Sequence, residues 1–127
     1  MTYLDGEEVL VLHARMIELI GGSHGVRDAE LLKSILEAPK QRFGGKALHA
    51  TVWEKAAVYL ERFAQFHVFV DGNKRTAIIA TARFLYLNGY TYHATNTETE
   101  RFVLRVTTEK LDMKEIAAWL KNHSKKQ

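Results

Sequence analysis

The segment from Ala77 to Leu87 constrains the fold of this chain more than any other segment. Most of its residues are apolar, whichever side of a helix they would face: Ala77, Ile78, Ile79, Ala80, Ala82, Phe84, Leu85 and Leu87. A helix on a protein surface has one apolar stripe, whereas a helix that is apolar nearly all round is enclosed by other elements. Asn88 and Gly89 then form a typical helix stop. The sequence therefore predicts a central helix with other helices packed around it.

Two helices are expected near the start of the chain. Asp5 followed by Glu8 is typical of a capped helix start, and Gly21-Gly22 stop this helix. A second helix is expected from about Asp28, and Pro39 ends it. The side chains expected to face inward from the first helix recur at helical spacing: Val9, Leu12, His13, Met16 and Ile20.

Three capping boxes predict the starts of three more helices. They are Thr51 with Glu54, Thr97 with Glu100, and Asp112 with Glu115. The last two open helices near Glu98–Glu109 and Met113–Asn122. The helix after Thr51 has an apolar face, and continuing that face by three residues reaches His67. We therefore expect the His67 side chain to point inward.

The remaining segments are short, and the whole chain is expected to form one domain. Residues Lys40 to His49 follow neither the helical nor the strand period, so this segment is either a mobile loop or a short hairpin. Only Tyr90 to His93 looks extended. A chain of 127 residues is long enough for one core and too short to expect two. The prediction is a compact all-α domain of six helices that spans residues 1–127.

Composition limits the classes of function. The chain has no cysteine, so disulfides and thiolate metal sites are excluded, and a reducing cytoplasm is compatible. No apolar run approaches the roughly 20 residues that span a bilayer, so no membrane association is expected. The net charge is +3, but Lys121, Lys125 and Lys126 are expected to form a solvated tail. Without a clustered basic stripe, direct nucleic-acid binding is not expected.

The residues just before the central helix form the candidate site. Residues 67–77 read His-Val-Phe-Val-Asp-Gly-Asn-Lys-Arg-Thr-Ala. A helix N-terminus attracts anions through its free N–H groups and partial positive charge. Gly72 allows the tight turn that exposes the N–H groups of Asn73 and its neighbours, and Lys74 and Arg75 can neutralise phosphate oxygens. The pattern favours a phosphate-binding helix start.

The other side chains of this segment suggest a reaction. Asp71 is its only carboxylate, and beside bound phosphates it would hold Mg²⁺. His67 can take a proton from an attacking hydroxyl, because histidine changes protonation near neutral pH. Phe69 can hold the loop from beneath. Transfer of a phosphorus-containing group from a nucleotide to a hydroxyl is the inferred chemistry.

Each of these residues alone also fits a purely structural role. A single inward histidine is commonly a core residue, adjacent cations are commonly solvated, and Asp-Gly is a turn signal. Their joint occurrence beside an apolar helix favours the functional interpretation. The chain has no P-loop sequence, no His-Glu-x-x-His pair and no Gly-x-Ser-x-Gly elbow, and its other histidines lack metal-ligand spacing.

The segment resembles the motif of the Fic/Doc (Fido) family, His-x-Phe-x-Asp/Glu-Gly/Ala-Asn-Gly/Lys-Arg. Every fixed position is filled, by His67, Phe69, Asp71, Gly72, Asn73, Lys74 and Arg75. The similarity includes the short length, the segment from Gly21-Gly22 to Leu31-Leu32, and the helix end at Asn88-Gly89. Within the family, the chain is most similar to the death-on-curing (Doc) toxins of type II toxin–antitoxin systems.

The resemblance implies a role for each matched residue. It makes His67 the general base and Asp71 the magnesium ligand. It assigns the nucleotide phosphates to Gly72, Asn73, Lys74 and Arg75, with Arg75 also counted as catalytic, and makes Phe69 a structural anchor. It also places the family's target-docking flap at Lys40 to His49. The expected cofactor is Mg²⁺, with ATP as co-substrate.

Two positions separate this chain from the Fic adenylyltransferases. Those enzymes typically have Gly at the position of Lys74 and a second Arg at the position of Ile78. The Lys form resembles the Doc branch, which phosphorylates a threonine of elongation factor Tu with the nucleotide bound in the reverse sense. The resemblance therefore favours a protein kinase over an AMP transferase. Two alternatives stay open: AMP transfer by the same fold, and a catalytically silent domain that binds a partner.

Control of the activity is expected to come from another chain. Some Fic proteins contain an inhibitory helix with the pattern Ser/Thr-x-x-x-Glu-Gly/Asn. No Ser or Thr of this chain is followed by Glu four residues later. The resemblance implies a Phd-like antitoxin whose C-terminal segment folds onto the toxin in a groove. The sequence leaves the oligomeric state open.

Overall fold

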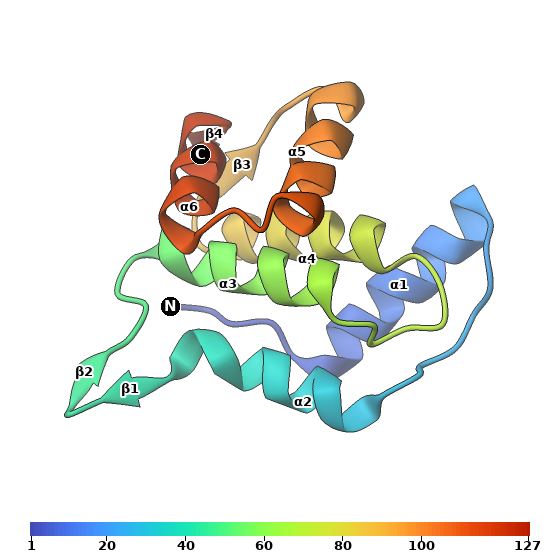
Figure 1. Ribbon diagram of the computed structural model, residues 1–127, viewed down its shortest axis with the longest axis horizontal. Coiled ribbons are helices and arrows are strands. Elements are labelled where there is room, and N and C mark those ends of the chain that lie inside the picture. Colours follow the sequence, from blue (N-terminus) through green and yellow to red (C-terminus); the bar gives the residue numbers. More distant parts are fainter.

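Helix α4 (Asn73–Leu87) lies in the middle of the molecule, as its apolar sequence predicts (Figure 1). The computed structural model describes residues 1–127. The other helices are α1 (Gly6–Ile20), α2 (Ala29–Glu37), α3 (Val52–Gln65), α5 (Asn96–Thr108) and α6 (Met113–Asn122). Two short antiparallel pairs complete the fold, β1 (Arg42–Phe43) with β2 (Lys46–Ala47) and β3 (Tyr90–Tyr92) with β4 (Ser124–Lys126). The expected compact all-α arrangement of six helices is confirmed.

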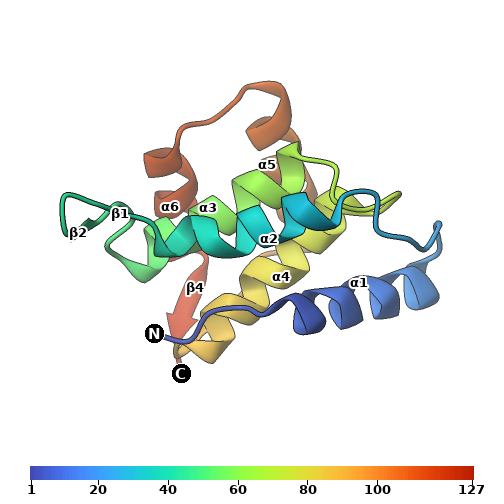
Figure 2. The ribbon, with the colours of Figure 1, turned by 90° about the horizontal axis from the view of Figure 1, so that it is seen from below.

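The helices form three layers around one core. Helices α3 and α4 run side by side in the middle, with α5 and α6 on one side and α1 and α2 on the other (Figures 1 and 2). Ala77, Ala80, Phe84 and Leu85 of α4 are fully buried, and Tyr59 of α3 packs edge-on against Phe84. Small alanines let neighbouring helices approach closely, while the aromatic rings fill the space between them.

Most predicted helix starts are confirmed by side-chain caps. The side chains of Asp5, Asp28, Thr51 and Asp112 each accept a hydrogen bond from a backbone N–H three residues later. Helix α2 ends at Glu37, and Pro39 lies in a 3-10 turn at Ala38–Lys40.

The predicted cap at Thr97 is wrong. The capping box is formed two residues earlier, by Thr95 and Glu98, and both of its reciprocal bonds are present. Thr95 has extended backbone angles, whereas Thr97 already lies inside the first turn of α5. Both Thr–Glu pairs have the right spacing, so the spacing alone could not choose between them.

The ambiguous segment at residues 40–49 and the segment predicted to be extended at residues 90–93 both contain strands. Residues 40–49 contain the β1–β2 hairpin, one of the two predicted alternatives, and Tyr90–Tyr92 forms β3. The partner of β3 was not expected, because the basic C-terminal residues were predicted to be a solvated tail. Lys125 and Lys126 belong to β4, although both residues are exposed. No helix combines the length and apolar character needed to cross a bilayer.

Candidate functional site

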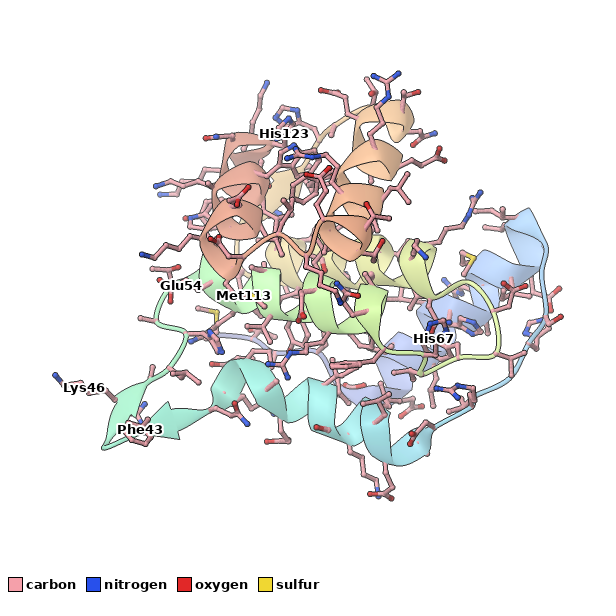
Figure 3. All side chains as sticks on the ribbon, viewed as in Figure 1. Phe43, Lys46, Glu54, His67, Met113 and His123 are labelled. Carbon is pink, nitrogen blue, oxygen red and sulfur yellow. The ribbon has the colours of Figure 1, made fainter.

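The candidate site lies in the loop between α3 and α4, and His67 is exposed there. The prediction that His67 points inward is wrong. Helix α3 ends at Gln65, and Phe66 is extended, so the helical spacing that predicted an inward histidine no longer applies at position 67. Figure 3 shows His67 in this loop, where the neighbouring ends of α3 and α4 are joined. An exposed imidazole can meet a substrate hydroxyl directly.

The loop is held in a compact form by Phe69 and Asn73. Phe69 is buried, with 1% of its surface exposed. The Asn73 side chain accepts a hydrogen bond from the Phe69 backbone N–H and donates one to the Phe69 carbonyl, both at 3.0 Å. These two bonds close the loop onto the first turn of α4. They also engage the Asn73 amide, so the group that Asn73 has free for a ligand is its backbone N–H.

A second segment, Gly25 to Asp28, braces the same loop. The backbone N–H groups of Arg27 and Asp28 both donate to the Val68 carbonyl, at 2.7 and 3.0 Å. The Val70 N–H donates to the Gly25 carbonyl at 3.0 Å. The Arg27 guanidinium also donates through Nε to the His67 carbonyl at 2.9 Å. Sequence reasoning did not identify Arg27 as part of the site; the only signal was that it lies in a segment matching the family.

The start of α4 differs from the other helix starts. Its N-cap is Gly72, with φ at +75° in the left-handed region, and no side chain caps it. The other five α-helices each begin with a side-chain cap. No capping side chain therefore accepts a hydrogen bond from the free N–H groups in the first turn of α4. Such free N–H groups attract anions.

Two unpaired cations lie in this first turn. Lys74 and Arg75 are exposed, and neither forms an ion pair with any of the chain's carboxylates. A planar guanidinium can bind phosphate through two N–H groups, and an ammonium adds a compact charge. Their assigned contacts with nucleotide phosphates stay predictions, as does the role of Gly72 beside them.

Asp71 is the residue that could hold a divalent cation. Its Oδ1 accepts the Gly72 N–H at 2.9 Å, and its Oδ2 accepts the Ser23 N–H at 3.1 Å. The residue is exposed, and each carboxylate oxygen keeps a further lone pair. No group of three or more His, Cys, Asp or Glu side chains could hold a metal by itself. Asp71 therefore fits Mg²⁺, which is commonly bound by one carboxylate together with phosphate oxygens and water.

A groove of about 510 Å³ begins at these cations. It lies between the end of α1, the first half of α4, and α5. Ile20, Ile78 and Leu104 form an apolar part of its wall. Lys74 and Arg75 also line the groove. The groove brings Ile78, which follows the motif by three residues, to the same surface as the two cations.

The β1–β2 hairpin does not border His67 in this structure. Figure 3 places Phe43 and Lys46 at the hairpin tip and His67 at the other end of the molecule, and the two ribbon views agree. Helix α3, with 14 residues, separates them. At about 1.5 Å per residue it is about 20 Å long. A target that docks on this hairpin must therefore extend along α3 to reach His67.

Comparisons with known proteins show the family of this chain. Residues 3–85 match the model of the Fic/DOC family. The chain is 37% identical over 120 residues to the protein named toxin Doc of Mycolicibacterium smegmatis, covering 93% of this chain and 90% of that protein. It is 33% identical over 89 residues to the protein named protein kinase doc of Escherichia phage P1, covering 70% of each.

Proposed function

Because this chain belongs to the Fic/DOC family, we propose that it is a Doc-type toxin of a toxin–antitoxin module and a protein-modifying enzyme. The proposed reaction transfers the terminal phosphate of ATP to a protein hydroxyl. We propose a threonine of elongation factor Tu as the acceptor, in the cytoplasm, with growth arrest as the result. The uncapped start of α4, with its left-handed Gly72 and two unpaired cations, is the observation that carries this proposal.

In the proposed mechanism, His67 accepts the proton of the acceptor hydroxyl. The hydroxyl oxygen then forms a bond to the terminal phosphorus, and the bond from that phosphorus to ADP breaks, so that ADP leaves. Lys74, Arg75 and the N–H groups of the first turn of α4 stabilise the charge on the phosphate oxygens. Asp71 would hold Mg²⁺, which supplies further neutralisation of phosphate charge.

Phosphate transfer is proposed over AMP transfer because of Lys74 and Ile78. Lys74 adds a cation at the start of α4. Ile78 places an apolar side chain in the groove wall, at the position where AMP-transferring relatives have a second arginine. The surface beside the phosphate cradle therefore offers one phosphate contact fewer than those enzymes use, which supports a different placement of the nucleotide.

Intact-mass analysis of elongation factor Tu tests the reaction. We expect incubation with this protein, ATP and Mg²⁺ to add one phosphate. His67→Ala should lower the rate by about 10²–10⁴, the usual contribution of a general base. His93→Ala is the matched control, because His93 is also an exposed histidine and lies outside the loop. Addition of AMP would overturn the interpretation of Lys74 and Ile78.

If elongation factor Tu gains no mass, either the target is another protein or the site is inactive. Growth of cells that express this protein then distinguishes the two cases. If expression arrests growth and His67→Ala does not, the enzyme is active on another protein. If His67→Ala arrests growth as strongly as the parent, the domain acts by binding a partner and the transferase proposal fails.

We further propose that the antitoxin partner occupies the groove beside α4. Apolar side chains make up part of the wall, which also includes Glu100. Lys74 and Arg75 form no ion pair within the chain, so an amphipathic helix with a carboxylate near these two cations fits the groove. Co-expression with a Phd-like antitoxin tests this placement. Leu104→Asp should abolish co-purification, and Val11→Asp, at an exposed apolar residue on a different pocket, should not.

A further inference from the structure

His13 is a buried residue that touches the candidate site from another element. It lies on α1, and 4% of its surface is exposed. Its ring lies flat on the ring of Phe69, with centroids 3.8 Å apart and planes inclined by 7°. The proposed reaction assigns no role to His13. A buried histidine stacked on the aromatic anchor of the loop therefore needs its own explanation.

The ring of His13 holds the peptide between Asp71 and Gly72. Its Nε2 lies 2.9 Å from the Asp71 backbone oxygen. A carbonyl oxygen only accepts hydrogen bonds, so Nε2 carries the proton and donates it. The other end of the same peptide is also held, because the Gly72 N–H donates to the Asp71 carboxylate at 2.9 Å. Both polar groups of this peptide unit are thus fixed.

This peptide unit needs fixing because of the residue that follows it. Gly72 has φ at +75° and no side chain, so its backbone reaches several conformations at little cost. A rotated peptide would release its carbonyl oxygen, the negative end of its dipole, from α1. A negative oxygen beside the first turn of α4 would oppose an anion, whereas the observed orientation keeps that oxygen bound to His13.

We propose that His13 is a positioning residue that locks the Asp71–Gly72 peptide in the orientation that lets the start of α4 bind phosphate. The importance of this orientation rests on the proposed function, but the lock itself does not. The hydrogen bond to Asp71, rather than the stacking on Phe69, is the part of His13 that performs this role.

Two substitutions separate the hydrogen bond from the stack. His13→Gln loses the ring but keeps an N–H donor at the same number of bonds from Cα as Nε2. His13→Phe keeps a ring against Phe69 but loses the donor. If stacking were the role of His13, Phe would replace it better than Gln. If the hydrogen bond is its role, Gln restores the site and Phe does not.

Nuclear magnetic resonance can observe this peptide without any ligand. The chain contains two Asp–Gly sequences, Asp5-Gly6 and Asp71-Gly72. Labelling Asp at the carbonyl carbon and Gly at nitrogen therefore selects two amide signals, and that of Gly6 serves as an internal reference. We expect His13→Phe to shift or broaden the Gly72 signal and His13→Gln to leave it near its position in the parent.

An ATP titration with Mg²⁺ tests the consequence. We expect His13→Phe to weaken ATP binding by about ten-fold, the effect of one lost hydrogen bond to a partly buried carbonyl. His13→Gln should stay within about two-fold of the parent, and so should His93→Phe, which changes an exposed histidine away from the site. Should His13→Phe not fold, His13→Leu replaces it, since Leu resembles Gln in size and has no donor.

The outcomes separate this inference from the proposed function. An unchanged Gly72 signal in the donor-free variant overturns the lock, and so does an equal disturbance in His13→Gln. If the parent does not bind ATP, the proposed function fails while the amide signals still decide whether His13 holds the peptide. If His13→Phe disturbs the Gly72 signal but leaves the ATP affinity unchanged, His13 holds the peptide, and this hold does not matter for phosphate binding.

Discussion

At the scale of single residues, Gly72 is the glycine with the least room for a side chain. A Cβ atom there would lie 2.4 Å from the Met16 methyl group and 3.3 Å from Ile17 Cδ1. Met16 is 3% exposed, so its methyl has little free room. The backbone angle adds strain for any residue with a side chain. We expect Gly72→Ala to lower the free energy of unfolding by about 1–3 kcal/mol, measured by urea denaturation.

Gly44→Ala is the control for this substitution. Gly44 also has a left-handed φ, at +57°, but a Cβ there meets no atom within 4 Å. Its loss of stability should therefore be smaller than that of Gly72→Ala. Equal losses in the two variants would mean that backbone strain alone acts and that the contact with Met16 is relieved without cost.

The sequence predicted which residues cluster at the site but not how they are held. Gly72 and Asn73 are found at the start of α4 because a turn and a helix start are local features. The exposure of His67 was missed, since periodicity does not say where a helix ends. The contacts made by His13 and Arg27 were also missed, because they join residues 58 and 40 positions apart in the chain.

At the scale of elements, the start of α5 can be tested by a matched pair of threonines. The Thr95 hydroxyl accepts the Glu98 N–H at 3.0 Å, and Thr97 lies within the first turn without a capping bond. Thr95→Ala should lower the free energy of unfolding by about 1 kcal/mol, and Thr97→Ala should change it by a few tenths at most. Thermal or chemical unfolding measures both. If Thr97→Ala lost more stability than Thr95→Ala, the cap would be Thr97, as the sequence alone predicted.

The junction between the β1–β2 hairpin and α3 should make stability depend on pH. Burial lowers the pKa of His49 below its ordinary value of 6.5, with Lys55 and Arg62 acting in the same direction and Glu54 opposing them. The unfolded chain therefore binds a proton more readily at this residue than the folded chain does. This contribution to stability is complete above about pH 6.5 and is lost as the pH falls below it.

His49→Gln removes this titration. We expect the unfolding free energy of the variant to fall less than that of the parent between pH 7 and pH 5, as measured by urea denaturation at each pH. The pH-dependent difference between the parent and the variant should grow as the pH falls toward 5. Parallel pH curves would show that His49 contributes nothing to the acid sensitivity of the fold.

Among the elements, the sequence predicted helices better than strands. Helices keep their caps and apolar period within a few turns, so α1, α3 and α6 could be located from local sequence. Strand β4 could not, because Ser124–Lys126 is polar and becomes a strand only by pairing with β3, more than thirty residues earlier. Pairing between distant segments leaves little trace in the sequence of one strand.

At the scale of the whole molecule, the two chain ends meet at the end of α4 (Figure 2). The Asn88 side chain accepts the Thr2 N–H and donates to the Thr2 carbonyl, both at 2.8 Å. The Gln127 N–H donates to the Gly89 carbonyl at 2.9 Å. Thr2 and Gln127 are thus fixed to Asn88 and Gly89, which are neighbours in the chain. This is the end of α4 opposite the candidate site.

Asn88→Ala should release the N-terminal segment. It removes both bonds to Thr2 and a third bond to the Phe84 carbonyl, so Tyr3 loses the tether that keeps it stacked on Phe84. We expect faster hydrogen exchange at the Leu4 amide, which donates to the buried Tyr59 hydroxyl, and a loss of about 1 kcal/mol in unfolding free energy.

Two further variants give this experiment its contrast. Asn122→Ala removes the same side chain at the end of α6, where it is exposed, and should leave exchange at Leu4 unchanged. Asn88→Asp keeps an acceptor for the Thr2 N–H but places a carboxylate oxygen against the Thr2 and Phe84 carbonyls, so its effect should be at least as large as that of Asn88→Ala. Unchanged exchange at Leu4 in Asn88→Ala would show that Tyr3 and Leu4 are held without the Asn88 bonds, by apolar packing and the Leu4–Tyr59 hydrogen bond. The end of α4 would then hold only the C-terminal end of the chain, through the Gln127–Gly89 bond beside the pairing of β3 with β4.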